Sequence, residues 1–128
     1  MSDPLDPHAW VDRAEEDLAM ARSTLRRKRP LTASACFHAQ QCAEKYLKAV
    51  LVAQAYPFPR THDLLALHTL CVQAGVISGL PIDRLESLSA YAVQVRYPGD
   101  DPTPDEAKEP LDATKVVRRF VRKFLGVQ

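Results

Sequence analysis

Residues 32–54 read TASACFHAQQCAEKYLKAVLVAQ and contain neither glycine nor proline. Apolar and small side chains recur along this stretch every three or four positions, which is the spacing of an α-helical face. They fill two neighbouring stripes, and a helix that is apolar over so wide an arc is usually packed on two sides. We expect it to be either the central helix of the domain or an element shared with a second subunit. The stripes are Cys36, Gln40, Ala43, Leu47 and Val50, and beside them Ala35, Ala39, Cys42, Tyr46 and Ala49.

Ten prolines divide the rest of the chain. Proline disrupts the interior of a helix but is favoured at its first position, so proline clusters mark helix boundaries. Further helices are predicted at about 8–28, 61–74, 81–96 and 103–125, and no segment has a convincing strand pattern. The predicted fold is all-α, an up-and-down bundle of four long helices plus a shorter one.

Local signals mark several helix starts. Asp6 can cap the first helix, and Pro7 follows it at the first helical position, where proline is favoured. Thr103 and Glu106 have the spacing of a capping box, and Pro110 should kink the last helix or delay its regular part. We expect Thr61 to cap the third helix.

Composition narrows the class of protein. The chain has 128 residues and 14.3 kDa, which predicts a single domain over 1–128. Seventeen basic residues against 16 acidic ones exclude a strongly basic coat protein for nucleic acid and a strongly acidic tail protein. Three cysteines make neither a disulfide framework nor a structural zinc site. Because the sequence has neither a membrane-spanning run nor a signal peptide, we expect a cytoplasmic protein. We also expect it to use no metal or other cofactor.

Four pieces of the sequence together resemble one family. Residues 39–51, AQQCAEKYLKAVL, resemble the second-helix signature of HEPN domains (higher eukaryotes and prokaryotes nucleotide-binding). Residues 14–18, residues 59–64 (PRTHDL) and Tyr91 followed by residues 96–98 (RYP) fit the same family in the same order. The resemblance covers nearly the whole chain.

The resemblance carries expectations about assembly and activity. It implies a helical bundle that forms a homodimer, often encoded beside a minimal nucleotidyltransferase in a toxin–antitoxin pair. Several branches of the family are metal-independent ribonucleases, in which an Arg-x(4–6)-His motif from each subunit meets across the dimer cleft. In related pairs a tyrosine beside that motif receives a nucleotide from the partner enzyme, and Tyr97 is a loose match to it.

The ribonuclease motif itself is missing from the sequence. No arginine has a histidine five to seven positions later, and the nearest approach, Arg60 to His68, is one position too long. Ribonuclease chemistry needs a cation for the phosphate and an imidazole that moves the 2′-hydroxyl proton. An enzyme would therefore have to use Arg96 with His62 or His38 brought into the same cleft.

One edge of the second helix carries Gln41, Glu44, Lys45 and Lys48. Two lysines on one edge could hold a phosphate, with Glu44 tuning their charge. The alternative is a solvated face with an ordinary Glu44–Lys48 pair at i, i+4. The sequence leaves both interpretations open.

Three further residues are candidates for the same binding site. His62 begins a helix and could act on a phosphodiester, or it could pack locally against the turn at 57–59. Arg96 could bind phosphate and Tyr97 could stack on a base. Alternatively, Arg96 forms a salt bridge at a helix end and Tyr97 plugs the end of the bundle.

The last helix has a basic stripe, which we expect to face outward. Ala113, Val117, Phe120 and Phe124 are expected to face inward on the opposite side. Such a stripe could bind RNA or an acidic partner, although most are simply solvated. The stripe consists of Lys115, Arg118, Arg119 and Arg122, with Lys123 beside it.

These observations favour a binding component of a nucleotidyltransferase–HEPN module. It would bind the partner enzyme, and nucleotide or RNA, through the candidate residues above. One alternative is a metal-independent toxin endoribonuclease with a rearranged site built on Arg96 and His62. Another is a structural subunit that presents a substrate and has no nucleotide affinity of its own.

Overall fold

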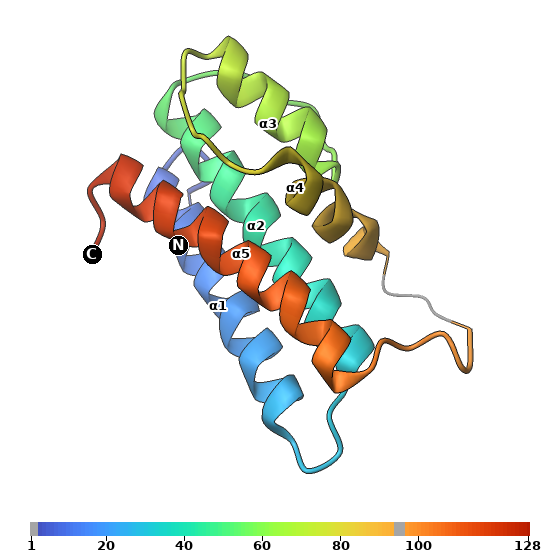
Figure 1. Ribbon diagram of the computed structural model, residues 1–128. Helices are drawn as coiled ribbons and strands as arrows, with labels where there is room; N and C mark the ends of the chain where they lie inside the picture. The colour runs from blue at the N-terminus through green and yellow to red at the C-terminus, as the bar shows by residue number, and fades with distance from the viewer. Residues whose placement is uncertain (1–2, 94–96) are drawn as a thin grey trace.

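The computed structural model describes residues 3–93 and 97–128, and every regular element in these ranges is helical (Figure 1). The predicted all-α bundle is confirmed. Three helices are long and two are short, and a 3-10 turn, η1 (Ala90–Ala92), follows the fourth. The helices are α1 (Pro7–Arg26), α2 (Thr32–Ala53), α3 (Leu64–Gln73), α4 (Ile82–Ser89) and α5 (Pro104–Leu125).

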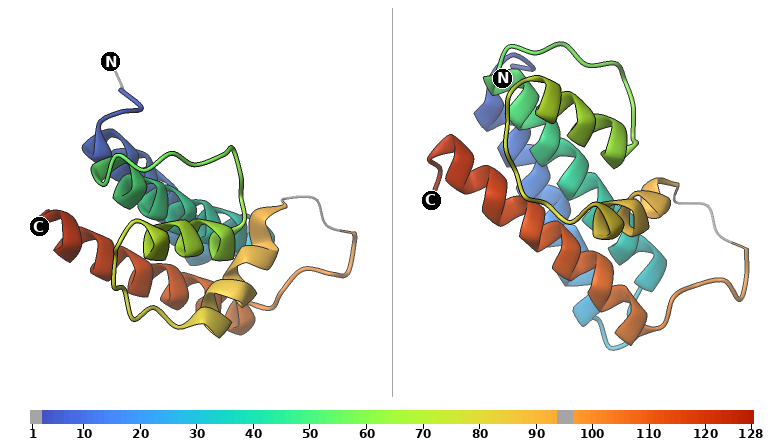
Figure 2. Two further views of the ribbon diagram at one scale, coloured as in Figure 1. Left: turned by 90° about the horizontal axis from the view of Figure 1, so that it is seen from above. Right: turned by 45° about the horizontal axis from the view of Figure 1, so that its top comes forward.

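α2 is the central helix. It packs against α1 on one side and α5 on another, while α3 and α4 cover a further part of its surface (Figure 2). Its residues Tyr46, Leu47 and Leu51 are fully buried and form the middle of the core. The wide apolar arc is therefore covered within one chain, as expected for the central helix of the domain.

The predicted signals at two helix starts are confirmed. The Asp6 carboxylate accepts a hydrogen bond from the His8 amide at 3.0 Å. Both bonds of the capping box between Thr103 and Glu106 are present, at 2.8 and 3.1 Å. α5 begins at Pro104 and continues through Pro110, so this proline does not delay the helix.

Two predicted helix bounds are wrong. α3 begins at Leu64, because Asp63 is its N-cap and Thr61 instead accepts a hydrogen bond from the Asp63 amide. α4 was expected to reach residue 96 but ends at Ser89, where the chain tightens into η1 and then becomes extended at Val93. Among the described residues, no helix is both long and apolar enough to cross a bilayer.

Candidate functional site: the polar face of α2

Gln41, Glu44, Lys45 and Lys48 lie together on α2, and we call them the polar face. α1 flanks this face on one side, through the Asp17 contact to Lys45, and the segment before α3 flanks it on the other, through His62. Glu44 and Lys48 are buried, and Gln41 and Lys45 are half-buried. The interpretation of these four residues as an open, solvated face is therefore wrong.

Glu44 is the centre of one group of interactions. It is only 3% exposed, and it accepts hydrogen bonds from Lys48 Nζ at 3.0 Å and from Gln41 Nε2 at 3.4 Å. His62 Nδ1 lies 2.9 Å from Glu44 Oε1. Because an ionised carboxylate can only accept, His62 must donate from Nδ1, which leaves Nε2 as the imidazole's acceptor nitrogen when the ring is neutral. The His62 side chain is 69% exposed, so a buried carboxylate orients an accessible imidazole.

The ammonium group of Lys48 contacts one carboxylate and two aromatic rings. Besides its bond to Glu44, its Nζ lies 5.7 Å from the centre of the Trp10 ring and 5.9 Å from that of Phe58. Both distances suit cation–π contacts. The i, i+4 pair considered from the sequence thus exists, but it is buried beneath aromatic rings.

Lys45 forms a second ion pair with Asp17 of α1. The other oxygen of Asp17 lies 2.8 Å from His38 Nδ1, and the carboxylate is largely buried. Sequence reasoning overlooked Asp17. The signal was available, because Asp17 shares a helical face with the buried residues Ala14 and Ala21.

The two lysines of the polar face are therefore already neutralised. Lys45 pairs with Asp17, and Lys48 pairs with Glu44. A phosphate would have to compete with a carboxylate for each ammonium group. That these lysines hold a phosphate remains a prediction.

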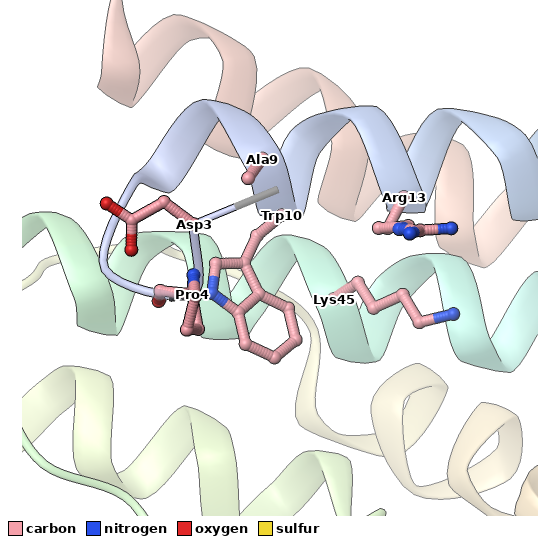
Figure 3. A pocket seen from close by; sticks show the side chains of 6 residues that line it. All are labelled: Asp3, Pro4, Ala9, Trp10, Arg13 and Lys45. Carbon is pink, nitrogen blue, oxygen red and sulfur yellow. Dashed lines mark hydrogen bonds between the residues drawn. The ribbon is translucent and has the colours of Figure 1, made fainter. Parts of the chain in front are cut away.

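An open groove runs beside the polar face around Trp10 (Figure 3). The indole Nε1 donates a hydrogen bond to the Pro4 carbonyl at 2.8 Å, which holds the ring against the segment that precedes α1. Two hollows of about 410 and 550 Å³ meet at Trp10 and Pro4. Their lining is largely apolar and includes Leu5, Val52 and Phe58. We call this the Trp10 groove.

Two candidate residues remain, Arg96 and Tyr97. Arg96 lies outside the described residues. The Tyr97 side chain is 80% exposed, so it does not plug the end of the bundle. The backbone carbonyl of Tyr97 accepts a hydrogen bond from the Asp100 amide. Of the candidate site, the structure brings together Gln41, Glu44, Lys48 and His62, with Lys45 alongside.

The basic stripe of α5 is only partly outward. Arg118 forms two hydrogen bonds to Glu15 of α1, at 2.8 and 2.9 Å, and Arg122 lies 3.7 Å from the same carboxylate. The prediction that both arginines point outward is wrong, because Glu15 draws them against α1. Phe124 was expected to face inward, but it is 40% exposed near the end of α5.

Glu15 also accepts a hydrogen bond from the Tyr46 hydroxyl at 2.6 Å. The hydrogen bonds from Arg118 hold the pKa of Glu15 below its usual value, against the opposing effect of its burial. Burial, helped by the bond to Glu15, raises the pKa of Tyr46 to about 12. The cluster therefore stays fixed as a carboxylate, a neutral phenol and guanidinium groups at neutral pH.

The family is decided by a match along almost the entire chain. The family model of the HEPN domain matches residues 7–124. The chain belongs to the HEPN domain family. This HEPN domain is 26% identical over 132 residues to the Methanocaldococcus jannaschii protein named "Putative toxin MJ1304", covering 91% of this chain and 86% of that protein.

Two crystal structures resemble this HEPN domain. One is of ST0689, described as an archaeal HEPN homologue, with 25% identity, a TM-score of 0.70 and coverage of 94% of this chain and 98% of that one. The other is of TT1696 from Thermus thermophilus, with 27% identity, a TM-score of 0.70 and coverage of 91% and 96%. The predicted family and helical architecture are thereby confirmed.

Proposed function

We propose that this HEPN domain is the toxin-like component of a two-gene module and binds a minimal nucleotidyltransferase as its partner. Membership of the family and similarity to the protein named "Putative toxin MJ1304" support the toxin-like part. The proposed docking surface is the Trp10 groove. Nucleotide or RNA would be a second ligand.

The neutral charge of this surface carries the proposal. Lys45 and Lys48 are each paired with a carboxylate, so the polar face has little attraction for a polyanion. The neighbouring groove is lined by apolar groups, and Leu5 at its edge is 82% exposed. A protein partner gains free energy by covering such a surface, whereas a phosphate gains almost none.

Trp10 provides a direct test because it is the only tryptophan in the chain. Labelling with 5-fluorotryptophan gives one ¹⁹F resonance in the groove, which should shift when a minimal nucleotidyltransferase from the same genome is added. Leu5→Glu should weaken the complex by about tenfold or more, roughly 1.4 kcal/mol, as measured by calorimetry. Ile77→Glu is the matched control, since Ile77 is 95% exposed and lines none of the groove. An unmoved resonance, or equal losses in both variants, would contradict the proposal.

The nucleotide part of the proposal is tested separately. Calorimetry with ATP and AMP should give heat of binding if the domain has its own nucleotide site. A domain that only presents a substrate would bind the enzyme and neither nucleotide. This outcome would support the structural-subunit alternative.

A homodimer is part of the same proposal, and the family resemblance is what supports it. Light scattering at micromolar concentration should give twice the chain mass of 14.3 kDa. A mass near that of a single chain would overturn it. The wide apolar arc of α2 gives the dimer no support, because α1, α3, α4 and α5 cover it.

One observation favours a second function, a metal-independent endoribonuclease. His62 is exposed and donates from Nδ1 to the buried Glu44, so Nε2 is positioned to accept the proton of a 2′-hydroxyl. Arg96 remains the candidate for holding the phosphate. Purified protein should then degrade total RNA in EDTA, and His62→Ala should abolish the cleavage without unfolding the protein. RNA that stays intact with the unaltered protein would rule this function out.

A further inference from the structure

α5 runs beside α1 (Figure 2). A dense group of cations from these two helices lines a hollow there. The hollow has a volume of about 370 Å³, lies apart from the Trp10 groove and shares no lining residue with it. We call this hollow the basic groove. Its charged lining residues are Arg22, Lys115, Arg118, Arg119, Arg122 and Lys123.

The basic groove concentrates charge far beyond the average of the chain. Six positive side chains line it, and Glu15 contributes the carboxylate that contacts two of them, which leaves a net charge of +5. The whole chain carries only +1. Like charges held this close repel one another, so an anion that enters the groove relieves the repulsion.

Two arginines of the groove are fixed before any ligand arrives. Glu15 binds Arg118 through two hydrogen bonds, and the Tyr46 hydroxyl lies 3.4 Å from Arg122 Nη1. Four cations remain without an ion-pair partner in the described part of the chain: Arg22, Lys115, Arg119 and Lys123. The groove therefore combines a rigid base with free charges around it.

From this arrangement we infer that the basic groove binds the phosphodiester backbone of a single-stranded nucleic acid. The cations of α5 recur every three or four residues, so successive charges lie about one helical turn, roughly 5.4 Å, apart. A strand with one phosphate per nucleotide can engage such a row. Four of the six cations are guanidinium groups, and two of them, Arg22 and Arg119, have no ion-pair partner in the described part of the chain and can bind phosphate oxygens through paired hydrogen bonds.

The lining favours nucleic acid over an acidic protein. Protein interfaces have an apolar core, but the apolar residue that lines this hollow is a single valine, Val127. No aromatic ring lines it for stacking on bases. Binding should therefore depend on the backbone and not on base sequence, and RNA and DNA strands should bind alike.

Fluorescence anisotropy tests the inference with labelled twelve-nucleotide strands of uridine and of thymidine. The test variant is Arg119→Gln with Lys123→Gln, because both side chains are exposed and neither takes part in the Glu15 cluster. At low salt its affinity should fall about tenfold for both strands. The slope of log K against log salt should become shallower by about 1.4, the value for two lost phosphate contacts on a single strand.

The matched control is Arg27→Gln with Arg29→Gln. Both residues are exposed beyond α1, and the double variant loses the same charge outside the groove. It should bind within about twofold of the unaltered protein. Thermal melting of both variants checks that the fold is intact.

Three outcomes would overturn the inference. One is an absence of binding up to about 100 µM protein at low salt, which lies at the weak end of non-specific nucleic-acid affinity. Another is an equal loss in the control variant. The third is displacement of the strand by a glutamate peptide of the same charge at equal concentration, which would assign the groove to an acidic protein. Because the two grooves share no residue, failure of nucleotidyltransferase docking leaves this result unaffected.

Discussion

At the scale of single residues, Glu15 connects α1 to two other helices. It accepts hydrogen bonds from Arg118 of α5 and from the fully buried Tyr46 of α2. Replacing the carboxylate by an amide removes one of the two acceptor oxygens and the negative charge that pairs with Arg118. Groups that lose a partner in this way cost more than the bond itself was worth.

Glu15→Gln is therefore expected to lower the free energy of unfolding by about 1–3 kcal/mol. Glu16→Gln is the control, because Glu16 forms only an exposed pair with Arg13 and should change stability by less than about 1 kcal/mol. Urea unfolding at pH 7 measures both values. Equal stabilities for the two variants would show that the cluster contributes nothing.

The same residue predicts how stability depends on acid. The pKa of Glu15 is lower in the folded chain than its usual value of 4.5, chiefly through Arg118. Its contribution is thus present above about pH 4.5 and is lost as the pH falls through the lower folded value. Melting temperatures between pH 3 and pH 7 should fall more steeply below pH 4.5 for the unaltered protein than for Glu15→Gln. Parallel curves would contradict the assignment.

At the scale of elements, α2 and α3 end in the same backbone turn, formed by different residues. After each helix the chain turns through a left-handed residue, and the next amide donates back to the last turn. Glycine serves this position after α3, at Gly75, because it has no Cβ to clash. After α2 the position is occupied by Ala55, with φ +53. A glycine in the sequence thus marks the end of α3, whereas no such residue marks the end of α2.

Ala55→Gly should therefore raise the free energy of unfolding by about 0.5–1 kcal/mol, since glycine adopts this conformation without strain. Ala53→Gly, at the last residue of α2, should instead lower it by less than about 1 kcal/mol, because this position belongs to the right-handed helix. Urea unfolding of the two variants separates a conformational effect from a general effect of glycine. The same sign in both would contradict the explanation.

At the scale of the whole molecule, α2 is the helix against which all the other described helices pack. Cys36 and Cys42 belong to α2 and are buried with it, and Cys71 is buried on α3. Burial raises the pKa of the Cys42 thiol to about 12 and that of Cys71 to about 11. All three cysteines are therefore small buried side chains of the core.

The native protein should accordingly resist thiol reagents. At pH 8 the three cysteines should react with Ellman's reagent far more slowly than in urea, where all three become accessible. The ratio of the two rates measures how rarely the bundle opens. Rapid reaction of one thiol in the native state would show that a helix separates easily from the core.

The sequence by itself determined where most helices begin, and that they form an all-α bundle. Caps such as Asp6 and the Thr103–Glu106 box act over two or three residues, so the information that specifies them is local. The polar face was also recognisable, because helical spacing alone places Glu44 and Lys48 on one edge.

Only the tertiary structure decided what those polar side chains do. Asp17 neutralises Lys45 across 28 residues, and Glu15 draws in Arg118 across 103. Helical spacing says which side chains share a face, but it does not say which helix will lie against that face. The charge that a ligand can reach depends on this packing. A charged side chain buried beside an opposite charge is neutralised, whereas an exposed and unpaired one can still bind a ligand. That is why the lysines of the polar face are paired, while several cations of the basic groove remain open.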